Sequence, residues 1–303
     1  MKIRYQAGIF LGAVLSLVLS QTASAQKEVL YSQYLINPIS INPAAAGSAE
    51  TFQLSASLRR KWFGIRNAPL TQTVSVDGAV ANGRVGLGFQ ALNDRMGLFA
   101  ATGAYGSVAY RFNMPALAKL SIGVQGGVSV LPLYDYSTAA AINRPIASLG
   151  LGIYYKGDRF FGGLSVPELV GRALDLSERY LYQSVRPVML QAGTRIDLSD
   201  KTVLIPSVLV SKIAERSPGV DLNARVWINE QLGLGLSYRY NSPGLVSANY
   251  LYALAEFQIS NAIRLGYTFY SQTPENPTAN LYFQPSTHEV TLRFTPNALT
   301  FTY

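Results

Sequence analysis

Apolar and polar residues alternate with a period of two along most of the chain after residue 51. In 119–130, for example, Leu120, Ile122 and Val124 share one face of an extended chain, while small or polar residues occupy the other. Successive side chains of a β-strand point to opposite faces, so this period predicts strands rather than helices. Each predicted strand has one apolar face and one face of small, polar or charged side chains.

The alternating segments predict fourteen strands, most of them close to the roughly 9–11 residues that a tilted strand needs to cross a membrane. Short connections alternate with mostly longer ones, which is typical of outer-membrane barrels with short periplasmic turns and long outer loops. The sequence therefore predicts an all-β fold, a transmembrane antiparallel β-barrel rather than a soluble sandwich. The even number of strands places both termini in the periplasm. The predicted strands are 51–60, 70–79, 84–93, 103–112, 119–130, 147–156, 159–166, 187–197, 202–211, 219–228, 232–240, 245–258, 262–271 and 286–294.

The composition fits a barrel wall. Hydrophobic residues make up 49% of the chain and charged residues only 14%, against about 25% charged in a soluble domain. The chain has no cysteine and a single histidine, His288, which excludes disulfides, thiolate sites and multi-histidine metal centres. The net charge is +8, but no basic run is longer than Arg59-Arg60-Lys61, so we do not expect nucleic acid as a partner.

Aromatic residues gather toward the ends of the predicted strands, where amphipathic rings suit the two membrane interfaces. We interpret them as girdle residues, although Tyr and Phe also favour strands in general. The set is Tyr110, Phe112, Tyr154, Tyr155, Tyr238, Tyr240, Tyr267, Phe269 and Tyr270.

The first 25 residues have the three parts of a secretory signal peptide. Lys2 and Arg4 give a positive start, residues 7–20 are apolar, and Ala23-Ser24-Ala25 fits a small-residue cleavage site. We therefore expect cleavage near Ala25 and a mature protein in the cell outer membrane.

Residues 26–50 precede the first predicted strand and contain the steps Asn37-Pro38 and Asn42-Pro43. Proline lacks an amide hydrogen and restricts its predecessor, so this segment is predicted to be ordered but irregular. We expect it to fold into the barrel mouth or lumen, or to dock periplasmic partners. The predicted organisation is a signal peptide (1–25), an N-terminal periplasmic or plug-like segment (26–50) and an outer-membrane barrel (51–303).

Several charged residues fall on the polar face of the predicted strands, which should line the lumen. We favour a lattice of paired charges that supports the wall, because Arg forks pair well with carboxylates. The alternative is an anion-selective pore or a surface that binds a plug. The candidate lumen charges are Arg225, Arg239, Arg264, Arg293, Asp221 and Glu289.

The sequence offers no catalytic, cofactor-binding or metal-binding candidate. Ser286 and His288 share the outward face of the last predicted strand, but neither an orienting group nor an oxyanion hole is evident. The Gly-Leu-Gly steps at 86–88 and 233–235 lie within alternating strands, where small lumen-facing positions explain them better than a phosphate-binding loop. We therefore predict a protein that is not an enzyme and needs no cofactor.

Ten short segments follow one another along almost the whole mature chain: SQY at 32–34, INPA at 41–44, AGS at 46–48, RRKWFGI at 59–65, APLTQT at 68–73, VGLG at 85–88, NDRMG at 93–97, LSYR at 236–239, LGY at 265–267 and STHEV at 286–290. Each segment is weak alone, but their order and spacing together resemble the PorP/SprF family of the type IX secretion system.

The resemblance implies a 14-strand barrel in outer-membrane lipid that takes part in protein secretion and, in some members, gliding motility. Such a protein links the outer membrane to periplasmic ring, motor or peptidoglycan-linked subunits, or supports export and surface attachment of one secreted adhesin. The alternative is a passive porin or a hydrophobic-solute channel. Candidate partner contacts are Trp62, Phe63 and Ile65 in the first outer loop, which could equally fold into the barrel mouth, together with Asn42 and Pro43.

The end of the chain leaves two segments to close the barrel. Family members commonly end soon after the strand predicted at 286–294, but nine more residues follow here. Leu299, Phe301 and Tyr303 alternate again, so 295–303 is an alternative closing strand.

Overall fold

The computed structural model describes residues 33–97, 99–135, 140–173, 187–213, 218–240, 249–273 and 286–296. The predicted signal peptide 1–25 and the first residues of segment 26–50 lie outside this part of the chain. No helix within the described ranges is long and apolar enough to cross a membrane.

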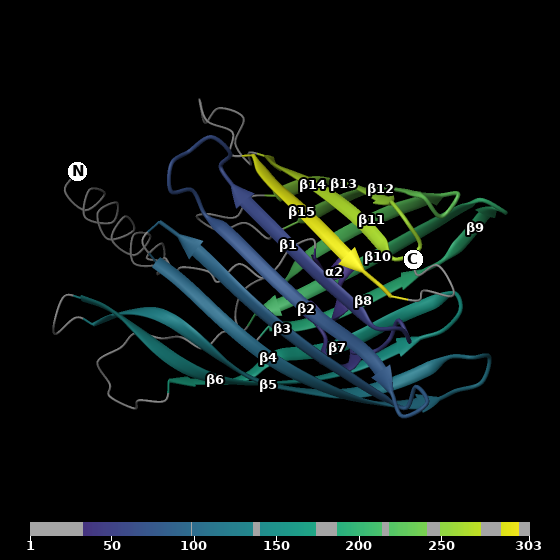
Figure 1. The fold of residues 1–303 in the computed structure, drawn as a ribbon, viewed down its shortest axis with the longest axis horizontal. Helices are drawn as coiled ribbons and strands as arrows, with labels where there is room; N and C mark the ends of the chain where they lie inside the picture. The colour runs from purple at the N-terminus through teal and green to yellow at the C-terminus, as the bar shows by residue number, and fades with distance from the viewer. Residues whose placement is uncertain are drawn as a thin grey trace, which may run out of the picture.

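The described strands form one continuous antiparallel sheet that curls into a barrel (Figure 1). The strands are β1 (Gln53–Lys61), β2 (Leu70–Val80), β3 (Val85–Met96), β4 (Phe99–Asn113), β5 (Lys119–Asp135), β6 (Ala140–Lys156), β7 (Phe160–Ala173), β8 (Pro187–Thr194), β9 (Ile196–Ser199), β10 (Thr202–Ile213), β11 (Gly219–Ile228), β12 (Leu232–Tyr240), β13 (Asn249–Gln258), β14 (Ile263–Thr273) and β15 (Thr287–Phe294).

Neighbouring strands pair in chain order, and the first and last strands pair with each other along a seam that runs from Leu54–Phe294 to Lys61–Thr287. The short strands β8 and β9 both pair with β10 and are separated by Arg195 alone, so they are two parts of one barrel strand. The prediction of a closed 14-strand antiparallel barrel is therefore confirmed. Because β15 pairs with both β14 and β1, the closing strand is 287–294 and not 295–303.

Burial alternates along the strands as the sequence pattern requires. Outward residues such as Val108, Leu222 and Leu236 are exposed, while inward ones such as Ser107 and Gln125 are buried. An exposed apolar face on every strand is what a barrel in lipid needs. Seven of the nine predicted girdle aromatics face outward, but Tyr154 and Tyr270 are buried inside the barrel.

The strands β3 to β7 are longer than the alternation predicts. The predicted loop at 94–102 is a tight hairpin in which Met96 pairs with Phe99, and β5 and β6 stay paired up to Asp135 and Ala140. Pro132 and Pro145 interrupt the sequence pattern in this hairpin, but pairing with the neighbouring strand carries the extended chain past them. The outer connections on this side are therefore shorter than expected.

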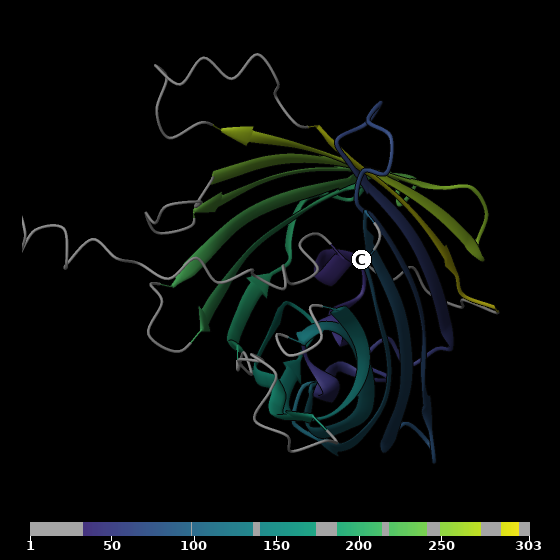
Figure 2. The same cartoon turned by 90° about the vertical axis from the view of Figure 1, so that its left-hand side faces the viewer.

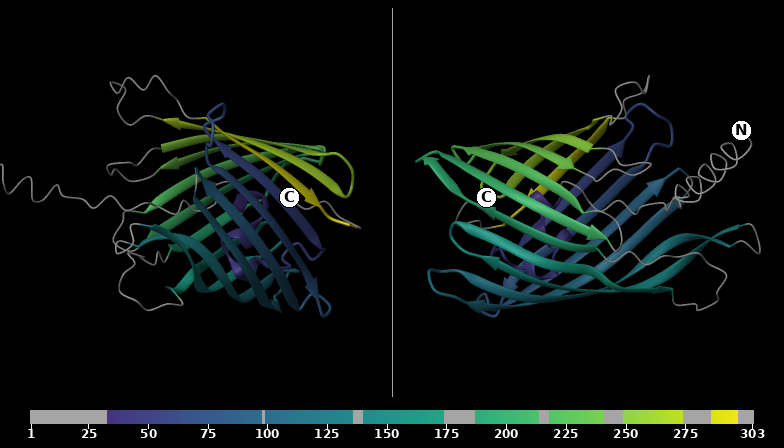
Figure 3. Two further views of the ribbon diagram at one scale, coloured as in Figure 1. Left: turned by 60° about the vertical axis from the view of Figure 1, so that its left-hand side comes forward. Right: turned by 180° about the vertical axis from the view of Figure 1, so that it is seen from behind.

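The interior holds the chain's own N-terminal residues. These form α2 (Gln33–Ile36) and two short 3-10 turns, η1 (Pro38–Ser40) and η2 (Pro43–Ala45). Figure 2 shows them within the ring of strands, and the two views of Figure 3 agree. Residues 33–50 are called the plug below.

Candidate functional site

The plug is built by its two Asn-Pro steps. Pro38 and Pro43 stand in the first turn of η1 and η2, where a missing amide hydrogen costs nothing. The side chain of Asn42 caps η2 by accepting a hydrogen bond of 2.9 Å from the amide of Ala44. The result is a compact pair of turns, and its residues from Ile41 to Gly47 are all buried.

The wall makes room for the plug with glycines. A Cβ added to Gly86 would overlap the carbonyl of Ala46, and one added to Gly123 would lie 2.5 Å from the backbone of Ala44. Further inward glycines meet the plug at similarly short range and are Gly88, Gly152 and Gly163. These five glycines on β3, β5, β6 and β7 are called the glycine bed. The prediction that Gly86 and Gly88 are small lumen-facing positions thus gains a physical reason, because the backbone of Ala46 packs against Gly86 and the side chain of Ile39 against Gly88.

Side chains of the wall satisfy the backbone of the plug, which needs partners because it is irregular and buried. Gln90 donates to the carbonyl of Ile39 at 2.7 Å and Ser165 to that of Ile41 at 2.7 Å. Arg225 donates to the carbonyl of Leu35 at 3.1 Å. Asp77 accepts from the amide of Gly47 at 2.9 Å. The contacts come from the neighbouring strands β2 and β3 and from β7 and β11, so the plug is held from several sides of the lumen.

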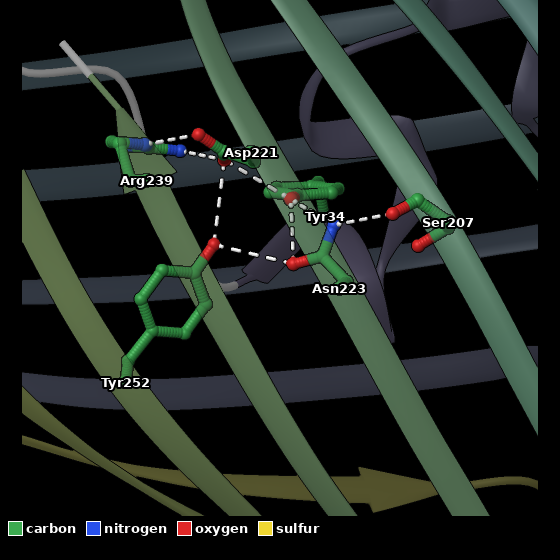
Figure 4. A network of polar contacts seen from close by, with 6 residues as sticks. All are labelled: Tyr34, Ser207, Asp221, Asn223, Arg239 and Tyr252. Atoms are coloured by element: carbon green, nitrogen blue, oxygen red, sulfur yellow. Dashed lines mark hydrogen bonds and ion pairs between the residues drawn. The ribbon is translucent and has the colours of Figure 1, made fainter.

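The start of the plug is held by a buried polar network (Figure 4). The hydroxyl of Tyr34 lies 3.1 Å from a carboxylate oxygen of Asp221, and the amide of Asn223 donates to the same hydroxyl at 3.0 Å. Arg239 holds Asp221 in a two-pronged ion pair, and the hydroxyl of Tyr252 reaches that carboxylate at 3.3 Å. Since the carboxylate is already paired with Arg239, Tyr34 joins a network that is nearly neutral overall.

The predicted lumen charges all lie on the inner face and are buried. The structure brings Asp221 and Arg239 together. It also pairs Arg225 and Arg264 with Glu256, at 3.1 and 3.8 Å.

Two further contacts complete this charged lining. Glu289 accepts from Tyr270 at 2.7 Å, and the guanidinium of Arg264 stacks 4.4 Å from the ring of Trp227. Removing one partner of such a buried pair generally costs about 3–5 kcal/mol, because the other charge stays buried.

Sequence reasoning missed Glu256 and Asp77 as lumen groups. A signal for Glu256 was present, because it stands between the apolar residues Ala255 and Phe257, which both face outward. The inner face of β13 also carries Tyr252 and Leu254, and these apolar neighbours blur the alternation on which the prediction relied.

The end of the plug is fixed by Glu50, just before β1. One of its carboxylate oxygens lies 2.6 Å from the ammonium of Lys119 and 3.3 Å from the guanidinium of Arg111. The hydrogen bond from Lys119, helped by the positive charges of Lys119 and Arg111, holds the pKa of Glu50 below its ordinary value of 4.5. The plug is therefore tied at both ends, by Tyr34 within the lumen and by Glu50 at the mouth.

We predict that Glu50→Gln lowers stability at neutral pH only. A lowered pKa means that the Glu50 carboxylate stabilises the folded state above about pH 4.5, and that this stabilisation is lost as the pH falls through the lowered value. The loss at pH 7 should be under about 1 kcal/mol, because the side chain is 59% exposed and water screens the pair. Urea unfolding of both proteins at pH 7 and at roughly pH 2 measures the difference.

The exposed residue Asp158 offers the control, since Asp158→Asn removes a carboxylate and leaves the contacts of Glu50 with Lys119 and Arg111 in place. An equal loss for Glu50→Gln at both pH values would show that the tie is not electrostatic.

Asn42 and Pro43 are almost fully buried within the lumen. Asn42 donates to the carbonyl of Ile153 at 2.9 Å, and both residues pack against Gly152. In this arrangement they contact the wall, and their role as partner contacts stays a prediction. The Asn-Pro step that prompted the prediction serves to fold η2.

Comparison with known proteins identifies the fold and its family. A family profile described as "Type IX secretion system membrane protein PorP/SprF" matches residues 23–294. The chain belongs to the PorP/SprF family. It is therefore an outer-membrane barrel of the type IX secretion system, as the resemblance implied. No curated protein sequence matches it.

Two solved barrels share the fold of this PorP/SprF protein. The outer membrane protein Omp33 of Acinetobacter baumannii is 8% identical with a TM-score of 0.52, over 81% of this chain and 98% of that one. The toluene transporter TodX of P. putida is 9% identical with a TM-score of 0.50, over 84% of this chain and 92% of that one. At such low identity the likeness concerns the barrel alone.

The first outer loop of the PorP/SprF barrel, 62–69, presents apolar side chains to the outside. Trp62, Phe63 and Ile65 are all exposed, Phe63 by 66%. The loop is anchored, because the amide of Trp62 donates to the carbonyl of Ser286 at 2.7 Å. The ring of Phe63 packs 5.0 Å from that of His288 on the outer wall. These three predicted contact residues are thus on the rim and not folded into the barrel mouth.

The outward polar residues Ser286, just before β15, and His288, on β15, take part in a short chain of hydrogen bonds. Ser286 lies 3.2 Å from one ring nitrogen of His288, and the hydroxyl of Tyr267 lies 2.6 Å from the other. A lipid-facing polar group is costly unless it is paired, and here each group is paired on the wall itself. Among the described residues no cluster of His, Asp and Glu could hold a metal ion.

Proposed function

We propose that this PorP/SprF protein is a closed anchor, without enzymatic activity, for other parts of the type IX secretion system. It would hold periplasmic secretion or gliding subunits at the outer membrane, or support export and surface attachment of a cognate adhesin. The observation that carries the proposal is the plug, which places the chain's own backbone inside the lumen and is tied to the wall at both ends.

The presence of the plug in the lumen argues against the alternative of a passive porin or solute channel. Open porins keep a water-filled channel lined with polar groups. Here polar groups of the wall, such as those of Gln90, Ser165 and Asp221, form hydrogen bonds with the plug. The working surfaces that remain are the rims and loops at the two ends of the barrel.

The exposed loop residues Trp62, Phe63 and Ile65 support a contact role at the outer rim. Aromatic residues are enriched in protein interfaces, and this loop is held in place by the Trp62–Ser286 hydrogen bond. A fixed loop loses less entropy on binding than a free one. We therefore propose these three side chains as contacts for a surface partner such as the adhesin.

Affinity purification of the full-length protein from its native outer membranes, followed by mass spectrometry, tests the proposal. We expect secretion-system subunits or one adhesin to co-purify, and purified barrel in planar bilayers to show no steady conductance. Steady open conductance together with the absence of any secretion partner would favour the porin.

The two arms of the proposal separate in a variant with Ala at 62, 63 and 65. Loss of an adhesin, with periplasmic subunits retained, assigns the loop to the outer partner. The matched control replaces the lipid-facing residues Val108, Leu222 and Leu236 with Ala, and it should leave recovery of every partner unchanged.

A further inference from the structure

One strand reaches past its neighbour at the barrel end that carries the short turns and the end of the plug, which is the periplasmic end of such barrels. Strand β7 begins at Phe160, which pairs with Thr194 of β8. The amide of Arg195 donates one more hydrogen bond, of 2.7 Å, to the carbonyl of Arg159. Beyond this point β9 continues alone on that side.

Strand β9 therefore has an open edge. Within the described part of the chain it pairs with β10 alone, and no strand pairs with its other edge. An open edge presents unpaired amide and carbonyl groups that pair readily with another extended chain. Proteins commonly limit such edges, and β9 is short, carries the charged Asp197 and shows a register shift near Thr202 and Val203, which leaves room for only a short added segment.

The most exposed apolar side chains of β9 lie beyond the last paired residues of β7 and β8. Ile196 is 42% and Leu198 58% exposed. Phe160, the outward aromatic at this end of β7, is level with Thr194. Leu198 is four residues further on, or about 13 Å along the strand. Exposed apolar side chains beyond the end of the neighbouring strand are available to pack against an added segment.

The inner side of β9 borders a cavity at the same mouth of the lumen. It has a volume of about 410 Å³. Most of its lining residues are charged or polar, among them Arg195, Asp197 and Lys201, and the apolar ones include Val203 and Trp227. A strand added beside β9 would alternate in the same way, with polar side chains toward the cavity and apolar ones toward Ile196 and Leu198.

We propose that the open edge of β9 is a docking site for a periplasmic partner of this protein, which adds one short extended segment to the barrel sheet. The segment carries alternating polar and apolar residues. It pairs with β9 on the side where β7 would lie if it extended beyond Phe160. This inference rests on the proposed anchoring function and names the surface that would serve its periplasmic arm.

Photo-cross-linking in native cells tests the site, with a photoreactive residue replacing Leu198. The same probe at Leu222 is the matched control, because Leu222 is 57% exposed on the lipid-facing wall. We expect the probe at Leu198 to give an adduct that peptide mapping assigns to one extended segment of a periplasmic protein, and the probe at Leu222 to give none.

A proline variant distinguishes strand addition from simple apolar contact. Along a strand, the amides of residues two apart point to the same side. The Arg195 amide points toward β7, so the Asp197 amide points to that side too, which is the open edge of β9. Asp197→Pro removes that donor at a place where edge strands tolerate proline. We expect it to reduce the adduct by about tenfold or more. The heat-modifiable gel mobility of the barrel should be unchanged, which shows that the variant folds.

The outcomes separate this site from the function on which it rests. A Leu198 probe that reaches only lipid or a second copy of this chain, while periplasmic subunits still co-purify, overturns the β9 site alone. An adduct that survives Asp197→Pro at full yield in a folded barrel overturns strand addition. Absence of every secretion partner in the purification overturns the anchoring function itself.

Discussion

Deletion of residues 33–46 should turn the closed barrel into a conducting one. The deleted stretch contains α2, η1, η2 and the whole hydrogen-bonded path from Tyr34 to Ile41. A 14-strand ring emptied of this chain is left with a polar, water-accessible lumen. We expect single-channel steps in planar bilayers, with conductance on the order of tenfold or more above that of the intact protein.

The deletion leaves Gly47, Glu50 and the β1–β15 seam in place, so the barrel itself should still assemble. The matched control deletes residues 62–65 of the outer loop, which removes exposed side chains but none of the plug. That control should stay closed. A plug deletion that assembles and still conducts nothing would mean that the wall side chains alone close the lumen.

Replacement of one bed glycine should displace the plug without removing it. A Cβ at Gly86 overlaps the carbonyl of Ala46, and that backbone cannot move aside while Asp77 holds the amide of Gly47. We expect Gly86→Val to lower the free energy of unfolding by about 1–3 kcal/mol or more, the usual effect of overpacking. It should also make the plug sensitive to protease in the folded barrel.

Gly106 on β4 provides the control, because a Cβ there meets nothing within 4 Å. Gly106→Val adds the same side chain to the outward face and should leave stability and protease resistance unchanged, or raise strand propensity slightly. Urea unfolding and limited proteolysis in lipid measure both variants. Equal behaviour of the two would show that the plug does not rest on the glycine bed.

The wall of this protein could be predicted from its sequence, because alternation is a local property. A strand such as 219–228 shows its inner and outer faces in its own residues, and it agrees with β11. Two adjacent residues of a strand also point to opposite faces of the wall. Tyr155 therefore faces outward and its neighbour Tyr154 does not, although both were predicted as girdle residues.

The interior could be predicted only in part, because its contacts join distant parts of the chain. The Asn-Pro steps of the plug and the small residues at 86 and 88 were visible separately. Nothing local indicates that Ala46 rests on Gly86, or that Tyr34 reaches Asp221 across 187 positions of sequence. The same limit applies to Glu256, whose role becomes clear only beside Arg225 and Arg264.

The seam between β1 and β15 has a consequence for biogenesis. A ring closed by its first and last strands is incomplete until the whole chain has been exported. The plug precedes β1, so it reaches the periplasm before any of the wall that later encloses it. The wall must then be assembled around residues already present, with the glycine bed on β3 to β7 available before the final strand arrives. Closure of the β1–β15 seam is therefore the step that encloses the plug.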